Sequence, residues 1–226
     1  MCLDYNKIEM ETIRRKITEK VYDLNKKDFR IDPLLEVAPD LSKLVKSIHS
    51  MAISHGTWIE ESLRDFVRAI PDWQSEIKVR LSVKSKITEI DNIAYNSTSG
   101  KVVLWERKRF WDTLDNPAKV AVSDRFEFLE ANKQLLETEL SNIIGATPKS
   151  VDMVVFNCWG KDKKWPKGMK EYKIYCRDEI SELFGPCIWE CIEFHRDYIT
   201  QTMSDVFGLN KKNNLDNNPF YKKFME

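Results

Sequence analysis

The sequence predicts an α/β (α+β) protein in which a central mixed sheet is flanked by helices. The hydrophobic pattern changes from helical spacing to strict alternation near residue 77 and returns to helical spacing after residue 124. Hydrophobic residues make up 42% of the 226 residues and Gly numbers only 7, so the chain can form a sizeable core. We expect a single domain over 1–226, with a core at about 41–158, a helical extension at 1–40 and a C-terminal strand and helix addition at 159–226.

Helices are expected before the first strand. Apolar residues at helical spacing predict helices at 1–29 and 41–51. A further helix is expected to begin at Thr57, because Thr57 and Glu60 have the spacing of a capping box, and to end before Pro71.

Three antiparallel strands are expected next. Apolar residues alternate with basic ones over 77–84, which is typical of a half-buried strand. Strands at 88–96 and 101–108 flank a polar turn that ends in Gly100. A long helix at 124–144, a buried strand at 151–156, a strand at 172–176 and helices within 178–207 follow.

The turn sets the pairing of the strands on either side of it. If Asn96 faces Lys101, counting outwards places Asp91 opposite Glu106, with Cβ atoms about 5 Å apart. Lys108 then lies on the same face, roughly 7 Å from Glu106. Two opposed carboxylates repel each other, and Mg²⁺ between them would remove the repulsion. With a lysine beside them, these groups indicate metal-assisted hydrolysis of a phosphodiester.

Asp91, followed after 14 residues by Glu106-Arg107-Lys108, resembles the signature of the PD-(D/E)XK nuclease superfamily. The resemblance covers about residues 41–158 and implies the restriction-endonuclease-like αβββαβ core. It implies that Asp91, Glu106 and the backbone carbonyl of Arg107 bind the metal, and that Lys108 assists the attacking water. The sequence departs from the pattern at Ile90, where the superfamily commonly has proline.

The resemblance also implies a further acid from the first core helix. Gly56-Thr-Trp-Ile-Glu60 matches the Gly-x-x-x-Glu pattern that many members have there, which makes Glu60 a candidate catalytic residue. Its alternative role is that of the capping box. For the acids on the strands, the alternative is an ordinary salt bridge on an exposed face.

The predicted activity is that of a Mg²⁺-dependent endodeoxyribonuclease similar to a type II restriction endonuclease, with Mn²⁺ as a substitute metal. The expected partners are double-stranded DNA, a second copy of the chain in a homodimer, and a methyltransferase acting on the same site. A nuclease of repair, recombination or phage defence is the alternative, as is a catalytically inactive nucleic-acid-binding module. Candidate DNA contacts, which could equally be solvated surface, are Lys84, Lys86, Arg109, Lys161, Lys163, Lys164 and Lys167.

Composition limits the partners and the cellular compartment that can be expected. Lys+Arg and Asp+Glu are both 36, so a polyanion must be met by local basic patches. No apolar run of about 18 residues occurs, and five cysteines at scattered positions favour reduced thiols, so a cytoplasmic protein is expected. Cys187, Cys191 and His195 share a helix face, but three ligands are too few for structural zinc, and we expect them to pack against other helices.

Overall fold

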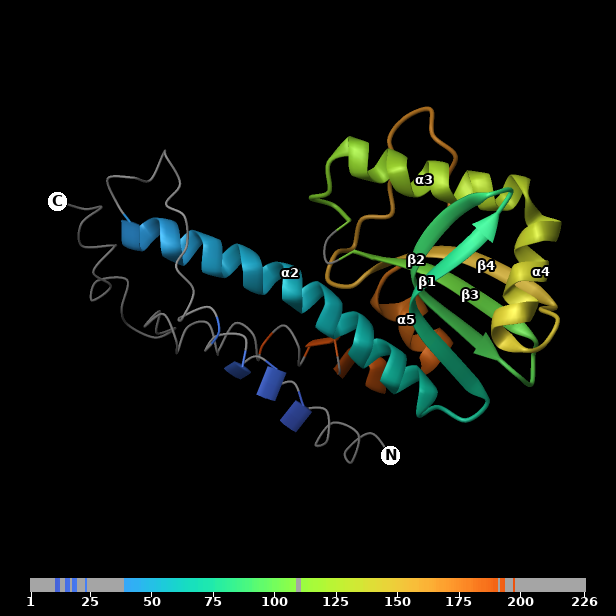
Figure 1. Ribbon diagram of the computed structural model, residues 1–226, viewed down its shortest axis with the longest axis horizontal. Helices are drawn as coiled ribbons and strands as arrows, with labels where there is room; N and C mark the ends of the chain where they lie inside the picture. Colours follow the sequence, from blue (N-terminus) through green and yellow to red (C-terminus); the bar gives the residue numbers. More distant parts are fainter. Residues whose placement is uncertain are drawn as a thin grey trace. The chain divides into compact units, whose positions relative to one another are not determined.

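A computed structural model describes residues 39–108 and 111–190, together with residues 11–12, 15–16, 18–19, 23, 192–193 and 197. The chain divides into two compact units, one formed by residues 1–59 and 191–226 and the other by residues 60–190. The second unit contains the sheet and the candidate site residues that are described (Figure 1). Arg109 and most of the helices expected at 1–29 and beyond residue 190 lie outside the described residues.

The helix before the sheet is continuous. α2 runs from Pro39 to Arg68, so the prediction of a helix that starts anew at Thr57 is wrong. Thr57 lies inside the helix, and only the first four backbone N–H groups of a helix need a cap, so Thr57 has no capping role. The apolar stripe of the last turns is buried at Leu63, Phe66 and Val67.

The protein has a mixed five-stranded sheet, which confirms the predicted class. Its order is β1-β2-β3-β4-β5; the first two pairings are antiparallel and the last two are parallel. The strands are β1 (Trp73–Val83), β2 (Lys86–Asn96), β3 (Lys101–Lys108), β4 (Ser150–Asn157) and β5 (Lys173–Tyr175).

The predicted pairing of the hairpin is confirmed from Asn96 as far as Asn92, and the predicted pair of Asp91 with Glu106 is not part of the observed register. Asn96 pairs with Lys101, and the register continues to Asn92 and Trp105. Gly100 has φ +72° in the turn, and an added Cβ there would lie 2.7 Å from the Lys149 side chain, so both the conformation and the space favour glycine.

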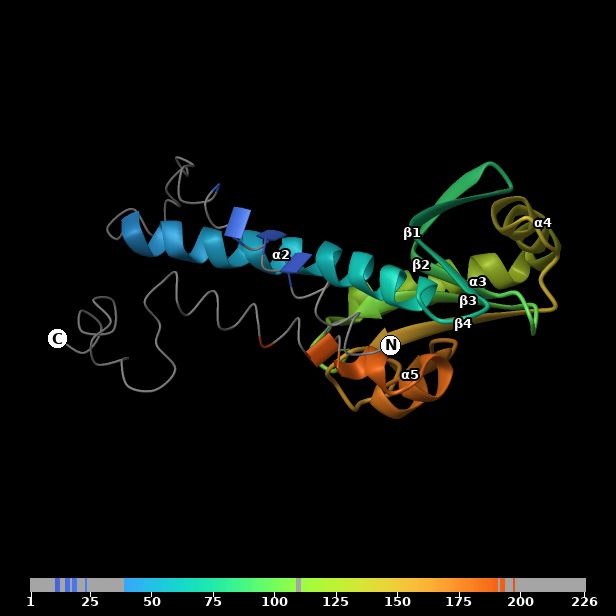
Figure 2. The ribbon, with the colours of Figure 1, turned by 90° about the horizontal axis from the view of Figure 1, so that it is seen from below.

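Helices cover both faces of the sheet (Figures 1 and 2). The helix predicted at 124–144 is instead two helices, α3 (Asn116–Ala131) and α4 (Lys133–Ile144), which lie on one face. α3 begins earlier than predicted because the Asp115 carboxylate caps it, accepting a hydrogen bond from the Ala118 N–H at 3.0 Å. α5 (Arg177–Phe184) lies on the other face, where Phe184 packs edge-on against Trp105.

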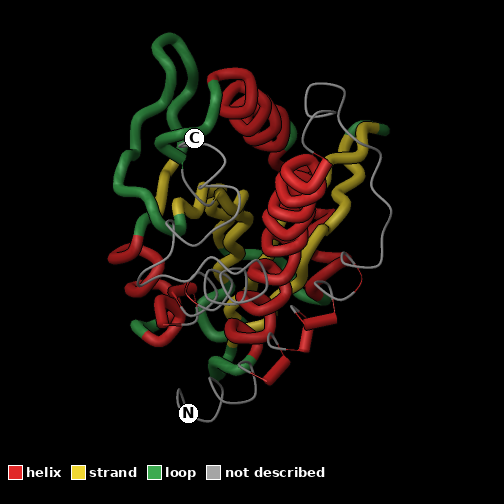
Figure 3. Tube along the Cα trace, turned by 90° about the vertical axis from the view of Figure 1, so that its left-hand side faces the viewer, coloured by secondary structure: helices red, strands yellow, loops and turns green. Residues whose placement is uncertain are grey.

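The main core lies between the sheet and the helices α3 and α4. Its buried members include Leu81, Val102, Leu104, Phe126, Leu129, Leu136 and Leu140. A long loop joins β4 to β5 (green in Figure 3), and Trp165 of that loop is part of the same core. The loop is therefore fixed to the core by an aromatic side chain.

None of the helices in the described part of the chain has the length and hydrophobicity that a membrane span requires. Cys158 and Cys176 are free thiols, as expected, but Cys187 is disulfide-bonded, so the expectation of reduced thiols is wrong for that residue.

Candidate active site

Regular strand pairing breaks down around Asp91. β2 pairs with β1 at every position from Lys86 to Asn96 except Asp91. Opposite it on β1, Lys78 has φ +51°, a conformation that residues other than glycine rarely adopt. The pairing of β2 with β3 also stops one position short of Asp91. Asp91 thus lies in a local irregularity of the sheet, a feature that often accompanies functional sites.

The irregularity turns β1 from one face of the sheet to the other. Trp73 packs against Phe184 of α5, whereas Leu81 and Val83 belong to the core beneath α3 and α4. Strict alternation would put all three odd-numbered residues on one face. The positive φ at Lys78 changes the phase of the alternation, so the strands can pack on α5 at one end and on α4 at the other.

Asp91, Glu106 and Lys108 come together on the α3 side of the sheet. The Lys108 Nζ lies 3.2 Å from Glu106 Oε2 and 4.0 Å from Asp91 Oδ2. The same Asp91 oxygen accepts a hydrogen bond from the Arg107 backbone N–H at 2.8 Å, taking the place of a strand partner. The side chains of Asp91 and Lys108 are 28% and 25% exposed, so a ligand from solvent can reach both. The predicted neighbourhood of these three residues is confirmed.

Glu106 is the most buried member of this group, with its side chain 1% exposed. Its Oε2 faces Lys108, and its Oε1 accepts a hydrogen bond from Arg125 Nη1 of α3. Burial, followed by repulsion from Asp91, raises the pKa of Glu106 above its usual value, and the attraction of Lys108 and Arg125 offsets only part of this rise. The carboxylate is thus desolvated, and Lys108 and Arg125 are the cations that bind its two oxygens.

Glu60 contacts a different partner from the one its predicted role requires. Its Oε1 accepts a hydrogen bond from Arg107 Nη2 at 3.0 Å, and both side chains are buried. Since side chains alternate along β3, Arg107 points to the face opposite Glu106 and Lys108. Glu60 is also not a capping-box residue, because α2 does not begin at Thr57. Burial raises the pKa of Glu60, Arg107 opposes this, and the charge of Asp91 adds to the rise, so Glu60 lies within electrostatic reach of the site.

The oxygen atoms at the site suit Mg²⁺. Arg107 donates its backbone N–H towards Asp91, and the N–H and C=O of a strand residue point to the same side, so its carbonyl is directed to the β2 side of β3 as well. Two carboxylates and a carbonyl, completed by waters and a phosphate, match the usual Mg²⁺ ligand set. Among the described residues there is no cluster of three or more His, Cys, Asp or Glu that could hold a metal, so a cation here would depend on these two acids and on oxygen atoms from elsewhere.

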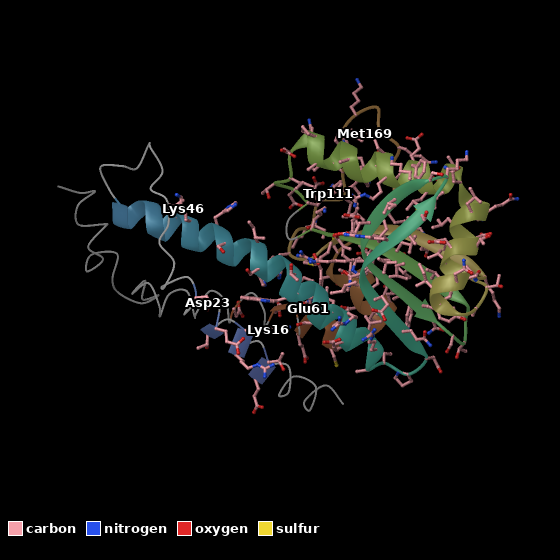
Figure 4. All side chains as sticks on the ribbon, viewed as in Figure 1. Lys16, Asp23, Lys46, Glu61, Trp111 and Met169 are labelled. Atoms are coloured by element: carbon pink, nitrogen blue, oxygen red, sulfur yellow. The ribbon has the colours of Figure 1, made fainter. Side chains whose placement is uncertain are left out.

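An amide network holds the segments that follow β3 and β4. Asn157 Oδ1 accepts hydrogen bonds from the Trp111 N–H at 3.0 Å and the Gly160 N–H at 3.1 Å, and its Nδ2 donates to Asp112 Oδ1 and the Asp162 carbonyl, both at 3.0 Å. The Trp111 ring (labelled in Figure 4) is buried, with the Lys119 Nζ 5.2 Å from its centroid. The network fixes the chain three residues beyond Lys108.

The lysines proposed to contact DNA differ in their surroundings. Lys161, Lys164 and Lys167 are exposed in the β4–β5 loop. Lys163, in the same loop, forms an ion pair with Glu179, which raises the pKa of its ammonium group. Lys84 is exposed in the β1–β2 turn, and the neighbouring Lys86 lies 4.5 Å from the centroid of the Phe128 ring.

Sequence reasoning missed Arg125 and Asn157. Arg125 lies on the same helix face as the buried Val122 and Leu129, three and four residues away, and a charged residue on an apolar stripe is a recognisable signal. The signal was lost because the helix was predicted to start at Asp124. Nothing in the sequence around Asn157 marks it as the centre of a network.

No protein-family model matches the chain, and no curated protein matches it.

Proposed function

We propose that the protein is a Mg²⁺-dependent endodeoxyribonuclease that resembles a type II restriction endonuclease. The observation that carries the proposal is the convergence of two carboxylates and one ammonium group at a break in strand pairing. Lys108 Nζ is within 4.0 Å of Asp91 and 3.2 Å of Glu106. Like charges are seldom placed opposite each other within a sheet, and clusters of charged groups with perturbed pKa values are typical of binding and catalytic sites.

The order of elements supports the same proposal. A helix, an antiparallel β1–β2–β3 meander, a helical segment and a β4 strand parallel to β3 follow one another, as the restriction-endonuclease-like core requires. The two acids come from β2 and β3, and the lysine follows Glu106 by two residues on the same face.

Each residue has a defined part in the proposed reaction. Asp91, Glu106 and the Arg107 carbonyl would hold the cation, which would supply Lewis-acid polarisation of the phosphate and lower the pKa of a water. Lys108 donates hydrogen bonds from a half-buried position between the two acids, so it orients the attacking water and stabilises the charge that develops on the phosphate. In the double-stranded substrate, a homodimer would place one such site on each strand.

Isosteric variants test the proposal. Asp91→Asn and Glu106→Gln should each reduce Mg²⁺-dependent cleavage of plasmid and phage DNA by at least about 10²-fold, because each removes a negative charge that would hold the cation. Asp124→Asn and Glu127→Gln, which change exposed acids of α3, are matched controls and should cleave like the unmodified protein. Lys108→Met should lose cleavage but retain Mn²⁺ binding.

The form of the products tests the finer assignment. Discrete fragments with a common end sequence support a restriction endonuclease, whereas a smear or a preference for branched DNA supports a repair or phage-defence nuclease. Equal cleavage by Asp91→Asn, Glu106→Gln and the unmodified protein would overturn the proposal.

A further inference from the structure

Arg125 binds the carboxylate of Glu106, the same group that the proposed function uses as a metal ligand. Its Nη1 donates a hydrogen bond to Glu106 Oε1, while Lys108 takes the other oxygen of the same carboxylate at 3.2 Å. Glu106 is 1% exposed, so solvent provides almost no alternative partner. In this structure both oxygens of the buried anion are bound by side-chain cations.

The charges of the group balance without a metal. Asp91 and Glu106 contribute two negative charges, and Lys108 and Arg125 contribute two positive ones. A divalent cation added to this arrangement would leave a net charge of about two around the buried Glu106 carboxylate and would lie beside the guanidinium. The group is therefore suited to hold either Arg125 or a metal ion at Glu106 Oε1, and disfavours both together.

Arg125 is placed so that it can move. Its side chain is 31% exposed, whereas its helix is anchored separately by the buried side chains of Val122, Phe126 and Leu129. A change of side-chain rotamer can take the guanidinium off Glu106 without moving α3. Once released beside a metal-bound phosphate, a guanidinium has a matching partner in the phosphate oxygens.

We infer that Arg125 neutralises Glu106 in the metal-free protein, gives way when a divalent cation binds, and then contacts the substrate phosphate. The inference rests on the proposed function and adds that Arg125 competes with the metal for Glu106. Arg125 would thereby couple metal binding to DNA binding, since the cation that displaces it creates the free guanidinium that DNA can use.

Metal affinity measured without DNA tests the first half. Titration with Mn²⁺, followed by electron paramagnetic resonance, should show that Arg125→Met binds Mn²⁺ about tenfold more tightly than the unmodified protein, because the metal no longer has to break a charge-assisted hydrogen bond. Arg125→Lys, which keeps the charge, should fall between the two. Arg80→Met is the matched control, since Arg80 forms an exposed ion pair with Glu89, and its Mn²⁺ affinity should not change.

DNA affinity tests the second half. With Ca²⁺ present, Arg125→Met should bind a short duplex several-fold more weakly than the unmodified protein; with EDTA the two should bind equally, because Arg125 is then held by Glu106. Mn²⁺ affinity that is equal or lower in both Arg125 variants would overturn the inference. If instead the unmodified protein and Glu106→Gln bind Mn²⁺ equally, the proposed metal site itself is wrong, so the two failures are distinguishable.

Discussion

The Asn157 network makes a quantitative prediction about stability. In Asn157→Ala the buried Trp111 N–H loses its acceptor, which costs about 1–3 kcal/mol. The other three hydrogen bonds join partly exposed groups that water can satisfy, and each contributes about 0.5–1 kcal/mol. We expect a total loss of about 4 kcal/mol, or roughly 8–16 °C in Tm for a chain of this size.

Urea denaturation followed by tryptophan fluorescence measures this loss. Asn142→Ala, at an exposed position of α4, is the control and should change stability by less than about 0.5 kcal/mol. A decrease in Tm of less than about 3 °C for Asn157→Ala would refute the reasoning, because the buried N–H would then have found another partner.

Asn157→Asp separates the network from simple loss of packing. Burial pushes the pKa of Asp112 upward, but hydrogen bonds from the Asn157 amide and the Asp162 N–H outweigh it, so the pKa lies below its usual value. In the aspartate variant the donor is replaced by a second carboxylate at the same place. Repulsion raises the folded-state pKa of that pair, so the variant should lose stability as pH rises from 4 to 8. A flat pH profile would contradict this account.

Two further predictions concern charge. Burial and Asp91 raise the pKa of Glu106, so the native state binds the Glu106 proton more tightly than the unfolded state, and stability falls as pH rises through the raised pKa. In EDTA, Glu106→Gln should therefore have a higher Tm than the unmodified protein at pH 8, and the difference should shrink towards pH 4. A lower Tm for Glu106→Gln at pH 8 would contradict this prediction. Removing Lys161 and Lys167 together should reduce the salt dependence of DNA binding by about two contacts, whereas Lys163→Ala should change it less because Glu179 already pairs with Lys163; equal slopes in filter binding at several salt concentrations would count against these contacts.

Local rules were sufficient for the hairpin. The turn from Asn96 to Lys101 and the alternation of side chains fixed which residues face each other, and the observed pairs agree. The same rules predict that Glu106 and Lys108, two residues apart on β3, share a face, and the ion pairs of Lys108 with Glu106 and Asp91 agree with this.

Local rules failed where packing decided the outcome. Thr57 and Glu60 have the spacing of a capping box, yet the helix continues through them, since a cap has meaning only where a helix ends. The helix after β3 starts eight residues earlier than predicted and breaks at Asn132, a residue whose side chain bonds to the Phe128 carbonyl. In both places the apolar pattern correctly predicted a helix but did not predict where the helix begins and ends.

The sequence by itself determined the strands, their register and the trio on the α3 face, because these depend on a period of two and on a turn of four residues. Only the tertiary structure decided that Glu60 bonds to Arg107, 47 residues away, and that Arg125 bonds to Glu106, 19 residues away. These pairs form because particular helix faces pack on particular sides of the sheet. That packing depends on the burial of apolar surface across the whole unit, not on the spacing of neighbouring residues.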